Sequence, residues 1–251
     1  MTNKQNGMSY KHEELKPYRN EGEKAEQIEE MFDNIAPEYD KFNYVASMNI
    51  DRIWRKRAIS ALKPFAPRKV LDIATGTGDL ALLIDKILKP ESIIGCDISE
   101  GMMQVAREKC KKRGVTNIVF EKEDCTALSY PDSSFDAVTS SFGVRNFQEL
   151  EKAMGEMHRV LREGGHLVIL ELSSPVSFPM KQLFPVYAKY IMPALGRLFS
   201  KDAKAYRYLP ESIAAFPQGE VMKGILEKSG FSKVEFRRFT GGVCTLYIAT
   251  K

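Results

Sequence analysis

The sequence predicts an α/β protein with a mostly parallel seven-stranded sheet that ends in an antiparallel hairpin. Short apolar runs alternate with helical patterns from about residue 69 to 172, which indicates a parallel sheet with helices on both faces. A stretch rich in proline and aromatic residues interrupts the alternation at 173–216. Two final apolar runs are separated by Gly241-Gly242, and so short a connection predicts a hairpin.

The N-terminal region predicts a tail and two helices. Residues 1–22 are polar, so they predict a disordered or loosely packed tail and no signal peptide. A helix from about 23 to 35 is expected to end at Pro37, because proline lacks the amide donor of a helix interior. A loop with Tyr39, Asp40 and Asn43 should follow, and then a helix at 50–62 that contains Trp54.

The remaining elements follow the alternation in order. Strands are expected at 69–74, 92–97, 117–121, 135–140, 165–172, 232–239 and 243–250. Helices are expected at 78–88, 100–113, 148–162 and 218–229. We interpret 173–216 as a helical cap over the carboxyl edge of the sheet, within one domain at 23–251.

Composition excludes several classes of function. A net charge of +4, from 37 basic and 33 acidic residues, predicts no nucleic-acid partner but suits loose contact with an anionic membrane. The four cysteines form no C-x-x-C pair and only three histidines are present, so no metal site is predicted. The cysteines are scattered, which suits a reducing cytoplasm. A membrane span needs roughly 20 apolar residues and no run approaches that length, so we expect a cytoplasmic protein.

The most informative segment is the loop after the first predicted strand. Gly76 and Gly78 let the backbone turn tightly and let a ligand approach it. Asp97 ends the second predicted strand, 21 residues after Gly76, where an acid can hold both ribose hydroxyls of an adenosine-bearing cofactor. The loop therefore predicts a nucleoside site at the sheet edge.

Two cofactors suit this loop. Gly76-x-Gly78-x-x-Ala81 also fits a loose dinucleotide fingerprint, so an NAD-dependent oxidoreductase is an alternative. Asp72 favours S-adenosylmethionine (SAM), because an acid four residues before the first glycine is typical of SAM-dependent methyltransferases. SAM has no phosphate to place on a helix N-terminus, and its cationic groups favour nearby acids. In a second interpretation of Asp72, its carboxylate ties down the amide groups of the loop.

Several blocks resemble the ubiquinone/menaquinone biosynthesis C-methyltransferase family, from about Met31 to the end. The first is Tyr39-Asp40-x-x-Asn43-x-x-x-Ser47 followed by Trp54, although the family usually has methionine at Phe42 and histidine at Asp51. The others are Ser141-Phe142-Gly143-Val144-Arg145-Asn146, the segment 159–167 with Glu171, and the segment 205–213. Glu163 replaces a usual proline in the 159–167 block.

The resemblance implies a class I SAM-dependent methyltransferase with a Rossmann-like fold. By this resemblance, Thr77 in the glycine loop would contact the cofactor, and so would Asp97 after the second strand. Further contacts would come from Asp124 and Cys125 after the third strand and from Ser141 after the fourth. Asp124 would accept from the adenine amino group, and the alternative for it is a turn-forming aspartate.

The implied reaction is C-methylation of a prenylated quinol, with demethylmenaquinol to menaquinol as the expected case. Loss of a phenol proton makes the ortho carbon nucleophilic. Arg145 is the candidate for lowering the pKa of that phenol because its guanidinium is permanently charged, and Asn146 is the candidate to assist. Alternatively, Arg145 pairs with an acid and only shapes its loop. Methyl transfer to an oxygen or nitrogen atom is a further alternative, because the residues that bind SAM are common to all SAM-dependent methyltransferases.

The prenyl chain of such a substrate lies in the bilayer. The cap at 173–216 combines apolar residues with Lys181, Lys189 and Arg197, so we expect it to bind the chain and to bring the enzyme to the inner face of the membrane. The alternative is that these apolar residues pack on the sheet or form a subunit contact in a homo-oligomer.

Overall fold

A computed structural model describes residues 9–18, 21–199 and 202–251 of the chain. Its sheet has the strand order β3-β2-β1-β4-β5-β7-β6. The parallel strands are β1 (Lys69–Ile73), β2 (Ser92–Asp97), β3 (Ile118–Lys122), β4 (Phe135–Ser141) and β5 (Leu161–Leu172). β7 (Cys244–Thr250) runs antiparallel between β5 and β6 (Ser232–Phe239). The predicted mostly parallel sheet with its terminal hairpin is confirmed.

The order of the strands locates the site. β1 lies between β2 and β4. The chain continues from β1 to β2 and β3 on one side and then crosses to β4 and β5 on the other, so the order reverses between β1 and β4. Ligands of open α/β sheets bind at such a switch point, outside the carboxyl ends of the strands. The central strands are near-continuous apolar runs because both of their faces are covered: six of the seven residues of β4 are buried.

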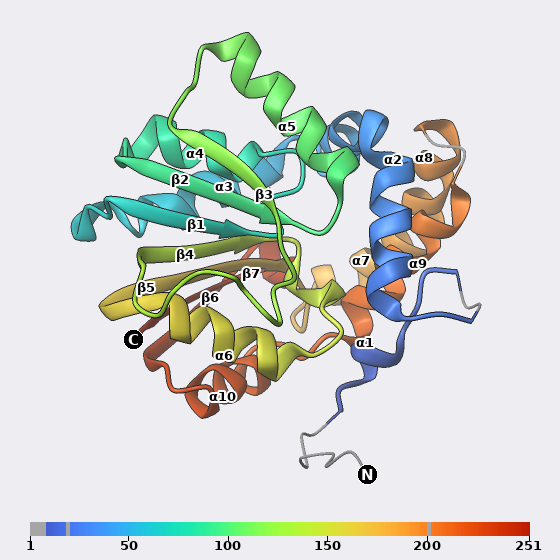
Figure 1. Cartoon of the computed structure of the whole chain (residues 1–251). Helices are drawn as coiled ribbons and strands as arrows, with labels where there is room; N and C mark the ends of the chain where they lie inside the picture. Colours follow the sequence, from blue (N-terminus) through green and yellow to red (C-terminus); the bar gives the residue numbers. More distant parts are fainter. Residues whose placement is uncertain (1–8, 19–20, 200–201) are drawn as a thin grey trace.

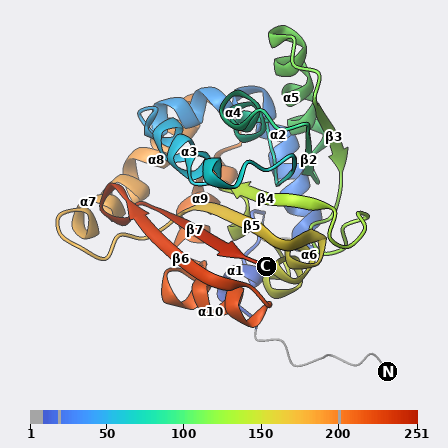
Figure 2. The same cartoon turned by 90° about the vertical axis from the view of Figure 1, so that its left-hand side faces the viewer.

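Helices cover both faces of the sheet (Figures 1 and 2). One face carries α3 (Ile50–Ser60), α4 (Asp79–Leu88) and α5 (Glu100–Arg113), and the other carries α6 (Leu150–Val160) and α10 (Glu220–Lys228). The boundaries of α5 follow from local chemistry, since the Ser99 hydroxyl accepts from the Met102 amide and Gly114 ends the helix at φ +67°.

The helix α2 (Lys24–Ala46) differs from the prediction. It continues through Pro37, so the expected break there is wrong, and Tyr39, Asp40 and Asn43 lie on a helix instead of in a loop. Proline costs the helix one hydrogen bond. However, Ile35 and Phe42, on either side of it, are buried in a cluster with side chains of α5 and α9. That packing stabilises one continuous helix over the local signal.

Part of the N-terminal segment packs on the domain. The side chain of His12 in α1 (Lys11–Glu14) is 0% exposed and contacts the ring of Phe216. The Tyr10 hydroxyl donates to Glu151 at 2.8 Å, and Nζ of Lys24 donates to the His12 carbonyl at 2.6 Å. Residues 9–18 of the expected tail are therefore held against the body, while residues 1–8 and 19–20 lie outside the described residues.

The segment 173–216 is largely helical. It contains α7 (Met180–Val186), a π-helical turn η3 (Tyr187–Ile191), α8 (Met192–Phe199) and α9 (Ala203–Ala215). Together with α2, these helices stand beside the carboxyl ends of the strands (Figure 1). Within the described residues, none of the helices is long and apolar enough to cross a membrane.

Candidate active site

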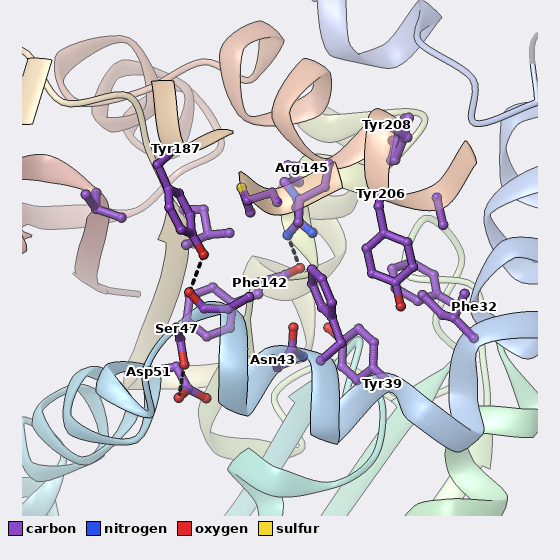
Figure 3. Close-up of a pocket in the computed structure, with 18 of the residues that line it drawn as sticks. Phe32, Tyr39, Asn43, Ser47, Asp51, Phe142, Arg145, Tyr187, Tyr206 and Tyr208 are labelled. Atoms are coloured by element: carbon purple, nitrogen blue, oxygen red, sulfur yellow. Dashed lines mark hydrogen bonds between the residues drawn. The ribbon is translucent and has the colours of Figure 1, made fainter. Parts of the chain in front are cut away.

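Two adjoining cavities lie at the carboxyl edge of the sheet. The larger, which we call the sheet-edge cavity, has a volume of about 530 Å³ and lies between the ends of β1–β4 and α2. The smaller, which we call the cap cavity, has a volume of about 120 Å³ and lies between α2, α3 and the cap helices (Figure 3). Four residues line both cavities: Phe32, Tyr39, Arg55 and Phe142. A ligand in one cavity can therefore contact a ligand in the other.

The glycine loop forms one wall of the sheet-edge cavity. Gly76 and Gly78 have φ values of +55° and +76°, and Gly78 precedes α4. The Gly76 amide donates to Oδ2 of Asp97 at 2.8 Å, and the Ser99 amide donates to Oδ1 at 2.9 Å. A carboxylate has about four lone-pair sites, so Asp97 can still accept from a further donor. Asp97 thus fixes the loop and also lines the cavity.

Asp72 lies beneath the loop and outside the lining of the cavity. Its carboxylate accepts from the Thr75 hydroxyl and from the Thr139 hydroxyl, each at 2.7 Å, and its side chain is buried. Burial raises the pKa of Asp72 to about 6. This geometry resembles the alternative interpretation of Asp72, although the carboxylate holds the loop through hydroxyl groups rather than amides.

Thr77 connects the loop to the N-terminal helix. Its hydroxyl donates to Oδ1 of Asp40 on α2 at 2.6 Å. Nζ of Lys109 bridges Asp40 at 2.5 Å and Asp79, the first residue of α4, at 2.7 Å. Because these contacts join α2, α4 and α5, they hold α2 across the mouth of the sheet-edge cavity.

The remaining predicted cofactor residues line the same cavity from β3 and β4. Asp124 is exposed at the rim, and its Oδ1 accepts from the Thr126 amide at 2.8 Å, as in a turn-forming aspartate. Cys125 and Ser141 also line the cavity. Asn146 is buried, and its Oδ1 has no hydrogen-bond partner among the described residues. A buried acceptor without a partner costs about 1–3 kcal/mol, which makes this atom a candidate acceptor for a ligand donor.

Arg145 lines the cap cavity from η2 (Val144–Asn146). Its Nη1 donates to the main-chain carbonyl of Phe142 (Figure 3) and to Oε1 of Glu171 at 2.9 Å. The Arg145 amide donates to Oε2 of Glu171 at 3.1 Å. Arg145 therefore does pair with an acid, as in the alternative interpretation. The pair also holds the guanidinium at the cavity wall, where Nε has no partner among the described residues.

The other walls of the cap cavity are mostly apolar and aromatic. Tyr39 and Asn43 of α2 both line the cavity, and burial raises the pKa of Tyr39. Tyr206 of α9 packs against Phe42, with ring centroids 4.2 Å apart. Further lining comes from Trp54, Phe184, Tyr187, Met192 and Leu209. A flat apolar ring with few polar groups suits such a lining.

The two cavities meet at a strained turn. Phe142, directly after β4, has φ +61°, and Ala74, directly after β1, has φ +53°. A Cβ atom on Gly143 would lie 2.4 Å from the Cβ of Ala74, so only glycine fits between the two turns. Non-glycine residues in this conformation cost free energy and are concentrated at functional sites.

Sequence reasoning overlooked two residues of this site. Glu171 belongs to one of the family motifs, but its pairing with Arg145 depends on the neighbouring positions of η2 and the end of β5. Arg55 was not singled out, because it sits among Arg52, Lys56 and Arg57. A usable signal was the acid four residues before Arg55, since residues at this spacing meet on a helix.

Solved structures share this fold at low sequence identity. A SAM-dependent methyltransferase from Thermotoga maritima superposes with a TM-score of 0.64 at 20% identity, covering 88% of this chain and 99% of that one. The [4+2]-cyclase SpnF superposes with a TM-score of 0.67 at 16% identity, covering 90% and 96%. Because one of the two is a cyclase, this likeness establishes the fold and not the reaction.

Closer relatives identify the family. A model of the ubiE/COQ5 methyltransferase family matches residues 20–251. A demethylmenaquinone methyltransferase of Bacteroides fragilis is 59% identical over 97% of this chain and 100% of that protein. A ubiquinone/menaquinone biosynthesis C-methyltransferase UbiE of a Geobacter species is 42% identical over 91% of this chain and 98% of that protein. The chain therefore belongs to the ubiE/COQ5 methyltransferase family, whose cofactor is S-adenosyl-L-methionine.

Proposed function

We propose that the protein transfers a methyl group from SAM to a ring carbon of demethylmenaquinol. The observation that carries this proposal is the pair of adjoining cavities, one lined by the glycine loop and Asp97 and the other apolar with Arg145 in its wall. Relatives at 59% and 46% identity are demethylmenaquinone methyltransferases, which favours the naphthalenoid ring. Family membership overturns the alternative of an NAD-dependent oxidoreductase.

The residues of the sheet-edge cavity fit SAM. Asp97 would hold the ribose hydroxyls, and Asp124 with the Cys125 amide would meet the adenine. Gly76, Thr77 and Ser141 would surround the rest, and the unpartnered Oδ1 of Asn146 would accept from its ammonium group. Gly78 lies outside the cavity lining, against Ala106 and Phe120, and would act by shaping the turn. When bound, SAM supplies an electrophilic methyl group. Asp72 would act through Thr75 rather than by contact with the cofactor.

Arg145 would make the ring carbon nucleophilic. Its fixed positive charge stabilises the phenolate that forms when one quinol hydroxyl loses its proton, and the oxyanion then pushes charge onto the ortho carbon. Glu171 holds the guanidinium in place. Since an arginine stays protonated, Arg145 cannot accept the proton, which passes to solvent water. Exact placement of the ring beside the methyl group contributes several kcal/mol, up to about 7–11.

The cap would meet the membrane. Phe178, Leu183 and Val186 are exposed by 83%, 58% and 55%, while Phe184 and Tyr187 of the same segment line the cap cavity. One side of this segment thus faces outward and the other faces the proposed substrate, which suits a prenyl chain that leads into a bilayer. The basic residues Lys181, Lys189 and Arg197 are exposed on it and complement anionic lipid. Assembly into a homo-oligomer stays a prediction.

Flotation with anionic liposomes tests the membrane contact. We expect the wild type to float and a Lys181→Glu/Lys189→Glu/Arg197→Glu variant to stay in solution. A matched control changes Lys111, Lys112 and Arg113 to glutamate, which reverses three charges at the end of α5. If both triple variants stay in solution, the loss of flotation reflects net charge and not the cap. If the wild type does not float, the proposed membrane contact is wrong.

The reaction itself is tested by offering alternative acceptors. The purified enzyme is incubated with SAM and with reduced demethylated quinols that carry either a naphthalenoid or a benzenoid ring. We expect a methylated product from demethylmenaquinol, detected by mass spectrometry. A product from the benzenoid quinol alone would contradict the proposed substrate.

A further inference from the structure

The sheet-edge cavity is strongly acidic and has few cations. Eight carboxyl side chains belong to its lining, on Glu23, Glu26, Glu29, Asp79, Asp97, Glu123, Asp124 and Glu149. Only Arg55 and Lys122 carry a positive charge among the described residues of the lining. Such a field suits the sulfonium and ammonium groups of SAM. It repels the α-carboxylate of SAM, which therefore needs a cation of its own.

Lys122 is a poor partner for that carboxylate. It is the last residue of β3 and lies next to Glu123 and Asp124, on the side of the cavity where the adenine would bind. Its ammonium already pairs with Glu29 at 2.5 Å, and its side chain is 53% exposed. The charge of Lys122 is therefore screened by water and engaged at the rim.

Arg55 has the properties that Lys122 lacks. It is 7% exposed, and its buried Nε has no hydrogen-bond partner among the described residues. Its guanidinium carbon lies 4.9 Å from the centroid of the Phe142 ring, at the turn where the two cavities meet. A guanidinium in such a position can offer paired donors to a carboxylate.

The charge of Arg55 also acts on the glycine-loop side of the cavity. Burial acts to raise the pKa of Asp79, but the positive charges of Lys109 and Arg55 outweigh it, so the pKa lies below its ordinary value. Asp79 is the first residue of α4, directly after Gly78. Arg55 and Asp79 both line the sheet-edge cavity, so the charge of Arg55 reaches its glycine-loop side.

The side chain of Arg55 is fixed from behind. Its Nη1 donates to Oδ2 of Asp51, one turn earlier on α3, and the Ser47 hydroxyl donates to Oδ1 of Asp51 at 2.7 Å (Figure 3). Asp51 is itself buried. This chain of contacts holds the guanidinium in one orientation and leaves Nε for a ligand.

We propose that Arg55 binds the α-carboxylate of SAM and thereby places the methionine part of the cofactor at the junction of the two cavities. The inference rests on the family's use of SAM, and it does not depend on which quinol is methylated. With the carboxylate at Arg55 and the ribose at Asp97, these two residues would hold the cofactor from both sides of its reactive centre.

Equilibrium binding tests this assignment without any turnover. Isothermal titration compares SAM with decarboxylated SAM, which keeps the sulfonium and the amine but lacks the carboxylate. We expect the wild type to bind SAM at least about tenfold more tightly than the decarboxylated ligand, as for a charge-assisted hydrogen bond. In Arg55→Met the two affinities should lie within about threefold, and Arg55→Lys should be intermediate.

Two controls separate binding from folding. Arg52→Met removes an exposed cation from the same helix and should leave the ratio of affinities unchanged. The double variant Asp51→Asn/Arg55→Met avoids an unpaired buried carboxylate and should lose the discrimination as the single variant does. Equal binding of both ligands by the wild type would overturn the proposal. A variant that weakens both ligands by the same factor would also overturn it, because Arg55 would then only support the fold.

Discussion

Arg145 and Glu171 form an ion pair, 2.9 Å long, in the wall of the cap cavity, with side chains that are 7% and 1% exposed. The same carboxylate accepts the Arg145 amide, so both the backbone and the side chain of this residue are fixed by one acid. The charge of Glu171 offsets the cost of burying the guanidinium. It also prevents the guanidinium from turning away when the cavity fills.

Arg145→Lys should retain SAM binding and lose turnover. Lysine can still pair with Glu171, but it loses the planar set of donors that serves Glu171 and Phe142 and that we propose also serves the substrate. We expect kcat to fall by about 10²-fold or more, as for loss of an oxyanion donor. Steady-state kinetics and SAM titration check this. An unchanged kcat would remove Arg145 from the mechanism.

Asp97→Ala should weaken SAM binding by about tenfold or more. The variant loses the proposed bonds to the ribose and also the hold on the Gly76 and Ser99 amides. Asp132→Ala is the control, because Asp132 is an exposed acid paired with Arg159 at a different place on the surface. Titration with SAM measures both. A change below about fivefold in Asp97→Ala would show that the ribose is held elsewhere.

Gly143→Ala should damage the site at the junction of the cavities. Its new Cβ would lie 2.4 Å from the Cβ of Ala74, so one of the two turns must move. Gly155→Ala, on α6, has open space around the new atom and should stabilise its helix by about 0.5–1 kcal/mol. We expect weaker SAM binding and a lower thermal midpoint for the first variant only. Normal binding by Gly143→Ala would mean that the turns are not tightly coupled.

His12 should make the fold sensitive to acid. Burial, with a smaller effect of the Lys24 charge, lowers its pKa from 6.5 to about 3. Because the folded-state pKa is depressed, the unfolded chain binds the proton first, and stability falls as the pH drops below 6.5. Between pH 6.5 and 5 the loss should amount to about 1.5 kcal/mol.

Urea unfolding at both pH values, for the wild type and His12→Leu, measures this contribution. The variant should lose clearly less stability on acidification than the wild type, whatever its absolute stability. Parallel pH profiles of the two proteins would show that His12 does not titrate in this way.

The sheet was readable from sequence because its signals are local. The buried strands are continuous apolar runs, and Gly76 and Gly78 mark the turn where β1 gives way to α4. At Pro37 the local signal was misleading, because burial of Ile35 and Phe42 outweighs one lost hydrogen bond. No local pattern reports that packing.

The lining of the sheet-edge cavity was more predictable than that of the cap cavity. Asp97 and Ser141 are the last residues of β2 and β4, and Asp124 follows β3, so all three lie at the edge where the ends of parallel strands meet. The Arg145–Glu171 pair and the position of Arg55 depend on how η2, β5 and α3 come together in space. Such contacts join residues far apart in the chain, so sequence alone names the participants without pairing them.

The destination of the methyl group tests the central claim most directly. The enzyme is incubated with SAM that carries a trideuterated methyl group and with demethylmenaquinol, and the product is analysed by mass spectrometry and NMR. We predict that the intact trideuterated methyl group appears on the quinol ring carbon next to a hydroxyl-bearing carbon. A label bound to oxygen, or an unlabelled quinol in the presence of bound SAM, would contradict C-methylation of this substrate.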